Sequence, residues 1–140
     1  MTVPESFQDR SFRFSLEILK FYRLIKQKTD LPYHMANQLM RAGTSIGANL
    51  EEAKSAYSRR DLASRQTIAL REARETRYWL RLIIAEQPGV RKEASLLLEE
   101  CSQLVAMLAA SVRKLRIEKA TTAAVTVSLL LLASHFWLLT

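Results

Sequence analysis

Apolar residues recur at a helical period in four successive stretches of the chain. The first covers about residues 6–28, the second about residues 31–56 and the third about residues 58–86, and the fourth begins near Val90. In each stretch the apolar stripe is wide, as expected of a helix that buries one face in a bundle. The pattern therefore predicts an all-α fold with four long helices.

The boundaries between these stretches carry residues that separate helices. Asp30 can accept hydrogen bonds from the free amides of the second helix, and Pro32 suits its first turn. Ser58 and Asp61 have the spacing of a capping box, with aspartate in place of the usual glutamate. Pro88, followed by glycine, marks the last break. Because short connections join long helices, we expect an antiparallel up-down-up-down four-helix bundle.

Two glycines, Gly43 and Gly47, lie four residues apart inside the second stretch. Each costs about 1 kcal/mol relative to alanine in a helix interior. Simple tolerance in a well-packed helix is one explanation, and close approach of another helix backbone is the one we favour. The residues that the spacing places in the core are Phe12, Phe14, Leu16, Ile18, Leu19, Phe21, Ile25, Leu39, Ala42, Ile46, Leu50, Ala53, Leu62, Ala69, Ala73, Thr76, Leu80, Ile83, Val90, Ala94, Leu97, Cys101, Leu104 and Leu108.

Residues 120–140 differ from the rest, because they include no Asp, Glu, Lys or Arg. As a helix they would span about 30 Å, the thickness of a hydrocarbon core, and Arg113, Lys114, Arg116 and Lys119 precede them as on a cytoplasmic flank. Threonines, serines and His135 dilute the hydrophobicity. A membrane anchor, a helix that docks on a partner or within an oligomer (slightly favoured), and a non-native extension all remain open. We therefore divide the chain into a bundle domain, 1–119, and an apolar C-terminal tail, 120–140.

The formal net charge is +7, from 21 basic and 14 acidic residues. This excess favours polyanionic partners such as RNA, DNA or an anionic membrane face. Cys101 is the only cysteine, so no intramolecular disulfide is possible, as is usual in a reducing cytosol. Residues 1–10 lack the apolar stretch of a signal peptide, and we expect a cytoplasmic protein.

Arginines are concentrated in the third stretch and just before it. Three of them share one helix face with a fourth beside it, and a guanidinium can bond two phosphate oxygens at once. We favour a nucleic-acid interface slightly over a solvated face with ion pairs. Tyr57 and Tyr78 offer rings for base stacking, whereas Trp79 is expected mainly in packing. The candidate nucleic-acid-binding residues are Arg59, Arg60, Arg65, Arg71, Arg74, Arg77 and Arg81.

A polar strip on the second stretch faces acidic residues on the third. We expect a structural hydrogen-bond network in which Arg41 pairs with Glu72 or Glu75, and which sets the helix register more than it adds stability. A catalytic site built on these carboxylates is far less favoured, because nothing identifies a substrate pocket. The residues of the predicted network are Arg41, Ser45, Asn49, Glu52, Glu72 and Glu75.

No residue pattern indicates a metal, a cofactor or an enzyme. A di-iron bundle needs a Glu-x-x-His pair on each of two helices, and neither His34 nor His135 follows a glutamate by three. The chain has no Gly-rich phosphate loop. Cys101 lies on the apolar stripe of the fourth stretch, where a buried, inert thiol is expected.

Two separated motifs stand out in the second and third stretches. Residues 41–53, RAGTSIGANLEEA, carry an arginine, serine, asparagine and glutamate repeat. Residues 68–80, IALREARETRYWL, carry a Glu-Thr pair followed by Trp-Leu. Together these motifs resemble the proteins encoded in intervening sequences of bacterial 23S rRNA genes. The resemblance covers about residues 8–117 and leaves out the tail.

The resemblance implies a short, non-enzymatic four-helix bundle that assembles as a ring-like homopentamer. It also implies kinship with accessory variability proteins of diversity-generating retroelements, which are basic pentamers that bind a reverse transcriptase and nucleic acid. The leading hypothesis is therefore a homo-oligomeric nucleic-acid-binding or scaffold protein. The alternatives are a retroelement accessory subunit that binds a reverse transcriptase with its RNA or cDNA, and a membrane-associated adaptor held by residues 120–140.

Overall fold

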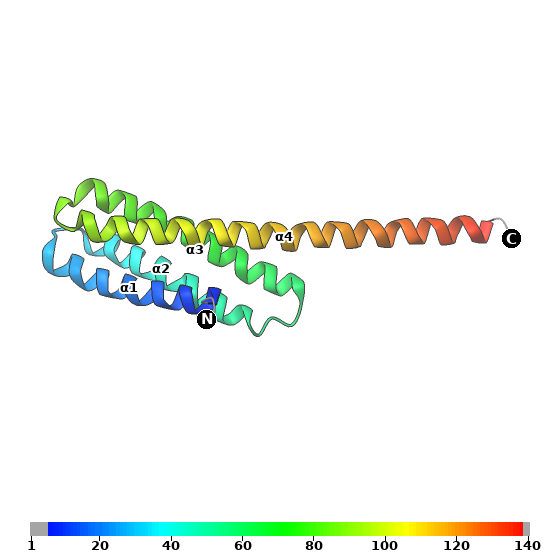
Figure 1. Cartoon of the computed structure of the whole chain (residues 1–140), viewed down its shortest axis with the longest axis horizontal. Coiled ribbons are helices and arrows are strands. Elements are labelled where there is room, and N and C mark those ends of the chain that lie inside the picture. Colours follow the sequence, from blue (N-terminus) through cyan, green and yellow to red (C-terminus); the bar gives the residue numbers. More distant parts are fainter. Residues whose placement is uncertain (1–5, 139–140) are drawn as a thin grey trace, which may run out of the picture.

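The computed structural model describes the backbone of residues 6–138 and the side chains of residues 6–117 and Thr121. Its helices are α1 (Phe7–Lys28), α2 (Tyr33–Ala53), α3 (Arg59–Glu86) and α4 (Arg91–Leu138), and a short 3-10 turn, η1 (Pro88–Val90), precedes α4. Residues 6–138 contain no strand. In Figure 1, α1, α2, α3 and the first part of α4 lie side by side. The predicted all-α fold with four helices is therefore confirmed.

Serine caps fix the starts of two helices. The Ser58 side chain accepts a hydrogen bond from the Asp61 backbone amide at 3.1 Å, as its spacing predicted, and Ser6 caps α1 in the same way. The expected cap of the second helix is wrong. Asp30 instead accepts a hydrogen bond from Gln87 Nε2 at 3.0 Å, and Pro32 stands just before α2 without a side-chain cap. Asp30 thus links the α1–α2 connection to the end of α3.

One apolar core joins the four helices. Its fully buried side chains include Phe14, Ile18, Leu39 and Leu104, at the predicted positions. The prediction fails on one flank of α1, where Phe12 is 64% exposed and Leu16 is 42% exposed. The reason is that residues two apart in a helix lie about 200° apart, so burial of Phe14 and Ile18 turns Phe12 and Leu16 away from the core.

The two helical glycines let α1 and α2 approach each other closely. A Cβ atom on Gly43 would lie 2.8 Å from Ile18 Cγ1 and 2.9 Å from Ile18 Cγ2. One on Gly47 would lie 2.8 Å from Ser15 Oγ and 3.3 Å from the Ser11 carbonyl oxygen. Real Cβ atoms rarely come so near. The favoured explanation, close approach of another backbone, thus holds at Gly47, whereas at Gly43 the Ile18 side chain fills the space.

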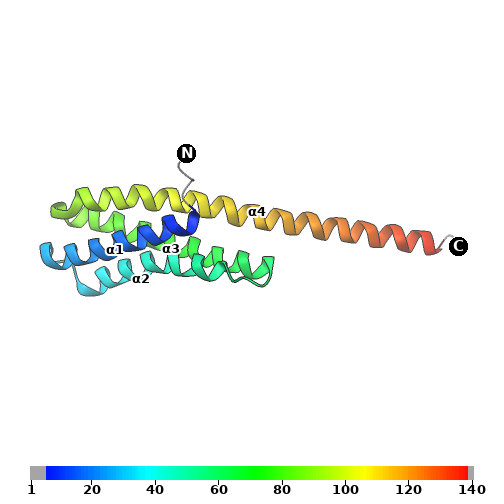
Figure 2. The same cartoon turned by 60° about the horizontal axis from the view of Figure 1, so that its bottom comes forward.

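Two polar contacts show the relative direction of α3 and α4. Cys101 Sγ lies 3.2 Å from the Ala73 carbonyl oxygen, and Ser111 Oγ donates to Gln66 Oε1 at 2.6 Å. Residue numbers therefore fall along α3 as they rise along α4. The last part of α4 extends beyond the bundle as a single helix in both views (Figures 1 and 2).

The predicted division between residues 119 and 120 falls within α4, where the backbone helix is unbroken. The side chains of residues 122–140, on which the interpretations of the tail rest, lie outside the described part.

Candidate nucleic-acid interface

A groove between α3 and α4 is lined by four arginines, two from each helix. Arg71 and Arg74 are three residues apart on α3, as Arg113 and Arg116 are on α4, so each pair lies on one helix face. The groove has a volume of about 320 Å³. We call it the arginine groove. Its other lining residues are Thr67, Leu70, Ala109, Val112 and Ile117.

The arginine groove combines an apolar floor with a charged rim. Leu70 and Val112 are buried, whereas all four arginines are exposed. No acidic residue lines the groove, and the described side chains form no ion pair with any of the four guanidinium groups. The positive charge is thus open to an external anion.

The structure brings together only part of the predicted arginine set. Arg65 is engaged by Glu52 in an ion pair and lies 3.6 Å from Asp61 Oδ1, so acidic groups neutralise it. Arg77 is half-buried beside Cys101. The remaining three are exposed but lie away from the groove, two at the start of α3 and one further along it: Arg59, Arg60 and Arg81.

Arg113 and Arg116 were missed as interface residues. Their signal was present, because they repeat the three-residue spacing of Arg71 and Arg74. Because Arg113 and Arg116 precede residues 120–140, they were assigned to the flank of the tail instead. Only the packing of α3 on α4 shows that the two pairs face one groove.

The predicted polar network is present as separate local contacts. Arg41 Nη2 reaches Glu75 Oε1 across α2 and α3 at 3.9 Å, the partner that was expected. Trp79 Nε1 donates to the same carboxylate oxygen at 3.2 Å. Asn49 Nδ2 donates to the Ser45 carbonyl oxygen within its own helix, at 2.8 Å.

The two other acidic members of that network lie apart from Glu75's contacts. Glu52 pairs with Arg65 near the α2–α3 turn. Glu72 has one buried carboxylate oxygen, Oε2, without a hydrogen-bond partner among the described residues. The strip thus consists of two ion pairs between α2 and α3 and one bond within α2, and it does not form one continuous network.

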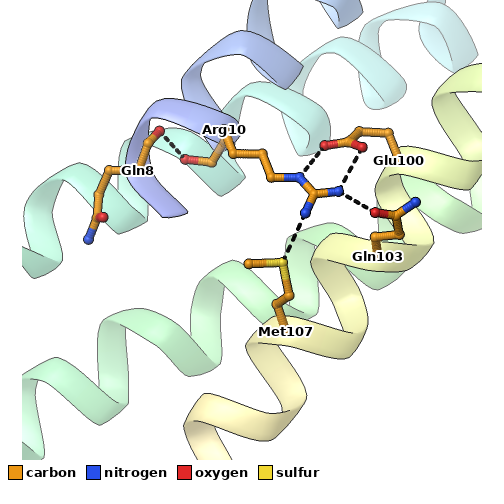
Figure 3. Close-up of polar contacts among 6 residues, drawn as sticks. Gln8, Arg10, Glu100, Gln103 and Met107 are labelled. Atoms are coloured by element: carbon orange, nitrogen blue, oxygen red, sulfur yellow. Dashed lines mark hydrogen bonds and ion pairs between the residues drawn. The ribbon is translucent and has the colours of Figure 1, made fainter. Parts of the chain in front are cut away.

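A polar clamp that the sequence analysis did not anticipate holds the start of α1 on α4 (Figure 3). Arg10 donates from Nε to Glu100 Oε1 at 2.6 Å and from Nη2 to Glu100 Oε2 at 2.9 Å. The same guanidinium also contacts Gln103 and, at 3.3 Å, Met107 Sδ. Hydrogen bonding to Arg10 lowers the pKa of the Glu100 carboxyl, although partial burial opposes this effect. This pair joins residues 90 positions apart.

Past this clamp, further along α1 and nearer the start of α4, lies a groove of about 450 Å³. Its apolar lining residues are Phe21, Leu24, Leu97 and Leu96, which is 62% exposed, and three charged residues, Glu17, Lys20 and Glu93, also line it. The exposed Met107 extends the apolar surface along α4. We call this surface the α1–α4 apolar face. Clustered exposed apolar side chains of this kind mark interaction surfaces.

The remaining candidate residues are structural or isolated. Cys101 is buried, as predicted, and burial raises the pKa of its thiol to about 12, which disfavours the reactive thiolate. Trp79 packs against the core, while Tyr78 is exposed and meets its ring edge-on at 5.1 Å. Among the described residues no group of three or more His, Cys, Asp or Glu side chains is placed to hold a metal ion.

Comparison with known proteins gives a protein family and similar solved structures. The family model described as 23S rRNA-intervening sequence protein matches residues 6–110. A protein of unknown function from the S23 ribosomal protein family of Bacteroides thetaiotaomicron has a similar structure, with a TM-score of 0.71 and 33% sequence identity. That similarity covers 76% of this chain and 98% of the other. No curated protein matches. Since the family model spans most of the helical bundle, the chain belongs to the 23S rRNA-intervening sequence protein family.

Proposed function

We propose that this chain is a non-enzymatic, homo-oligomeric protein that binds nucleic acid by holding backbone phosphates in the arginine groove. The observation that carries the proposal is the convergence of four exposed guanidinium groups from two helices on a groove that no carboxylate lines. Arginine forks match the oxygens of a phosphate, and contacts to phosphates give affinity without reading base sequence.

Self-association is proposed to take place through the α1–α4 apolar face. Leu96 is 62% exposed there and Met107 is 38% exposed, and a second copy would cover these side chains. The family resemblance implies a ring of five subunits, each an up-down-up-down antiparallel bundle. The opposite directions of α3 and α4, given by the Cys101–Ala73 and Ser111–Gln66 contacts, support the antiparallel bundle. A ring would repeat the arginine groove, and several weak grooves on one strand would bind far more tightly than one.

The test is a titration of fluorescently labelled single-stranded RNA and duplex DNA, followed by anisotropy over a series of salt concentrations. If one protomer neutralises four phosphates, log Kobs should fall with log[salt] with a slope of about −3 to −4. The groove variant replaces all four arginines with glutamine: Arg71→Gln, Arg74→Gln, Arg113→Gln and Arg116→Gln. At about 0.5–1 kcal/mol per exposed contact, it should bind about 30-fold to 1,000-fold more weakly.

The matched control removes the same charge from the other end of the bundle, with Arg23→Gln, Lys28→Gln, Arg91→Gln and Lys92→Gln. All four of these side chains are exposed. It should keep most of the affinity, because net charge alone contributes little at physiological salt. The proposal fails if the groove variant binds as well as the unmodified chain, or if both variants lose the same affinity.

The alternative partner is a reverse transcriptase, which the resemblance to retroelement accessory proteins implies. A protein partner of that kind would use the α1–α4 apolar face, with its RNA or cDNA in the arginine groove. Co-purification with such a polymerase, lost on Leu24→Ser/Leu96→Ser and kept in the groove variant, would support this assignment. Co-purification that is insensitive to both changes would count against it.

A further inference from the structure

The helix α4 continues past the bundle. It runs without a break from Arg91 to Leu138, whereas the family model ends at residue 110. Figures 1 and 2 show the last part of α4 projecting as a single helix, and none of the other described elements lies beside it. Because no other described part of the chain covers this helix, its composition indicates whether its surroundings are water or lipid.

The projecting segment has the length and composition of a bilayer span. Residues 120–138 contain no Asp, Glu, Lys or Arg, and as a helix they are about 28 Å long, close to the hydrocarbon thickness of about 30 Å. Residues 129–132 are four consecutive leucines. Successive helix positions are 100° apart, so this run is spread round the whole helix, and a partner protein that covers one stripe would leave part of it in water.

The first described hydroxyl of the segment makes a bond that is compatible with a bilayer. Thr121 Oγ1 donates to the Ile117 carbonyl oxygen, four residues back, at 3.1 Å. Thr44, Thr67 and Thr76 make the same bond within the bundle helices. A hydroxyl paired in this way leaves no donor unsatisfied in hydrocarbon.

The end of the bundle from which α4 emerges is cationic. Arg113, Lys114 and Arg116 are exposed on α4 directly before the apolar segment. The Gln66–Ser111 contact fixes the level of α3 against α4, and Arg59 lies about 10 Å further along α3, level with α4 just before residue 120. If residues 120–138 spanned a bilayer, cations just before them would lie at the level of the anionic headgroups of a cytoplasmic leaflet.

From these features we propose that residues 120–138 of α4 insert into a lipid bilayer and hold the bundle against its cytoplasmic face. The span lies beyond the bundle. Residues 88–117 also pass a test of length and composition for a membrane helix, but their buried Leu104 and Leu108 form part of the bundle core. The segment is therefore an anchor, and the bundle stays in water.

The test is flotation of the full chain with vesicles of phosphatidylcholine alone and of phosphatidylcholine mixed with phosphatidylglycerol. The chain should float with both, more completely with the anionic mixture, and should resist a high-salt wash and an alkaline wash. Leu130→Arg/Leu131→Arg should reduce partitioning into either vesicle more than a hundredfold, because each arginine near the bilayer centre is strongly disfavoured. The matched control, Leu130→Ile/Leu131→Ile, should float as the unmodified chain does.

Far-UV circular dichroism and cooperative unfolding check that both variants keep the bundle. Three results would overturn the proposal: a chain that stays in the aqueous fraction with both vesicles, complete release by salt alone, or flotation that the arginine pair leaves unchanged. A detergent-free oligomer that dissociates on introduction of the arginine pair would identify a second copy as the occupant, which also overturns it.

Discussion

Replacing Gly43 with alanine tests how closely α1 and α2 approach each other. The new methyl group would lie 2.8, 2.9 and 3.1 Å from Cγ1, Cγ2 and Cδ1 of Ile18, which is fully buried. Because a β-branched side chain is stiff at χ1, Ile18 cannot easily turn away. Overpacking a core costs about 1–3 kcal/mol, and three such contacts favour the upper value. Alanine regains about 1 kcal/mol of helix propensity, so we expect a net loss of about 2 kcal/mol.

The two other glycines serve as controls. On Gly47 the nearest atom is Ser15 Oγ, which can rotate away, so Gly47→Ala should stay within about 1 kcal/mol of the unmodified chain. Gly89 has nothing within 4 Å and no positive φ, so Gly89→Ala should stabilise the fold by about 0.4–1 kcal/mol through the unfolded state.

The assay is urea unfolding followed by far-UV circular dichroism, at one protomer concentration because self-association changes apparent stability. Ile18→Ala should also cost less in the Gly43→Ala background than alone, since it removes the atoms that clash. The argument is refuted if Gly43→Ala is as stable as the unmodified chain, or if the two changes are simply additive.

Three further predictions concern single contacts. The Arg10 contact lowers the pKa of Glu100, so its stabilisation is present above the unfolded pKa of the carboxyl and is lost as pH falls. The free energy of unfolding should therefore fall less steeply with decreasing pH for Glu100→Gln than for the unmodified chain. An equal slope would exclude the clamp. Cys101 should react with a thiol reagent only as fast as the fold opens, so labelling in native buffer should accelerate with added urea. Ser58→Ala should lower the free energy of unfolding by about 1 kcal/mol, measured by the same urea titration, whereas Ser58→Asp should not.

Periodicity alone predicted most of the buried face of the bundle. Leu39, Ile46 and Leu104 are buried where the helical spacing placed them, because a residue's angle around its own helix follows from its number. Phe12 and Leu16 show the limit of this rule. Their spacing marks an apolar stripe, but it carries no information about whether the partner of that stripe belongs to the same chain.

The candidate site was less predictable for a related reason. The arginine groove depends on how α3 and α4 are rotated against each other, and the two arginine pairs lie some 40 positions apart in the chain. The same holds for Arg10 and Glu100, which meet across 90 positions. Spacing within a helix does not determine such a rotation; it is set by which core side chains pack together.

The unequal packing of α1 has a consequence for how the chain folds. Each helix packs mainly on its neighbour in the sequence, whereas α1 makes shorter contacts with the distant η1 and α4, and Asp30 bonds to Gln87. A chain with mostly local contacts folds quickly, and this one can be built hairpin by hairpin during synthesis. The Arg10–Glu100 pair then forms last, so mutations in it should accelerate unfolding while leaving the folding rate almost unchanged.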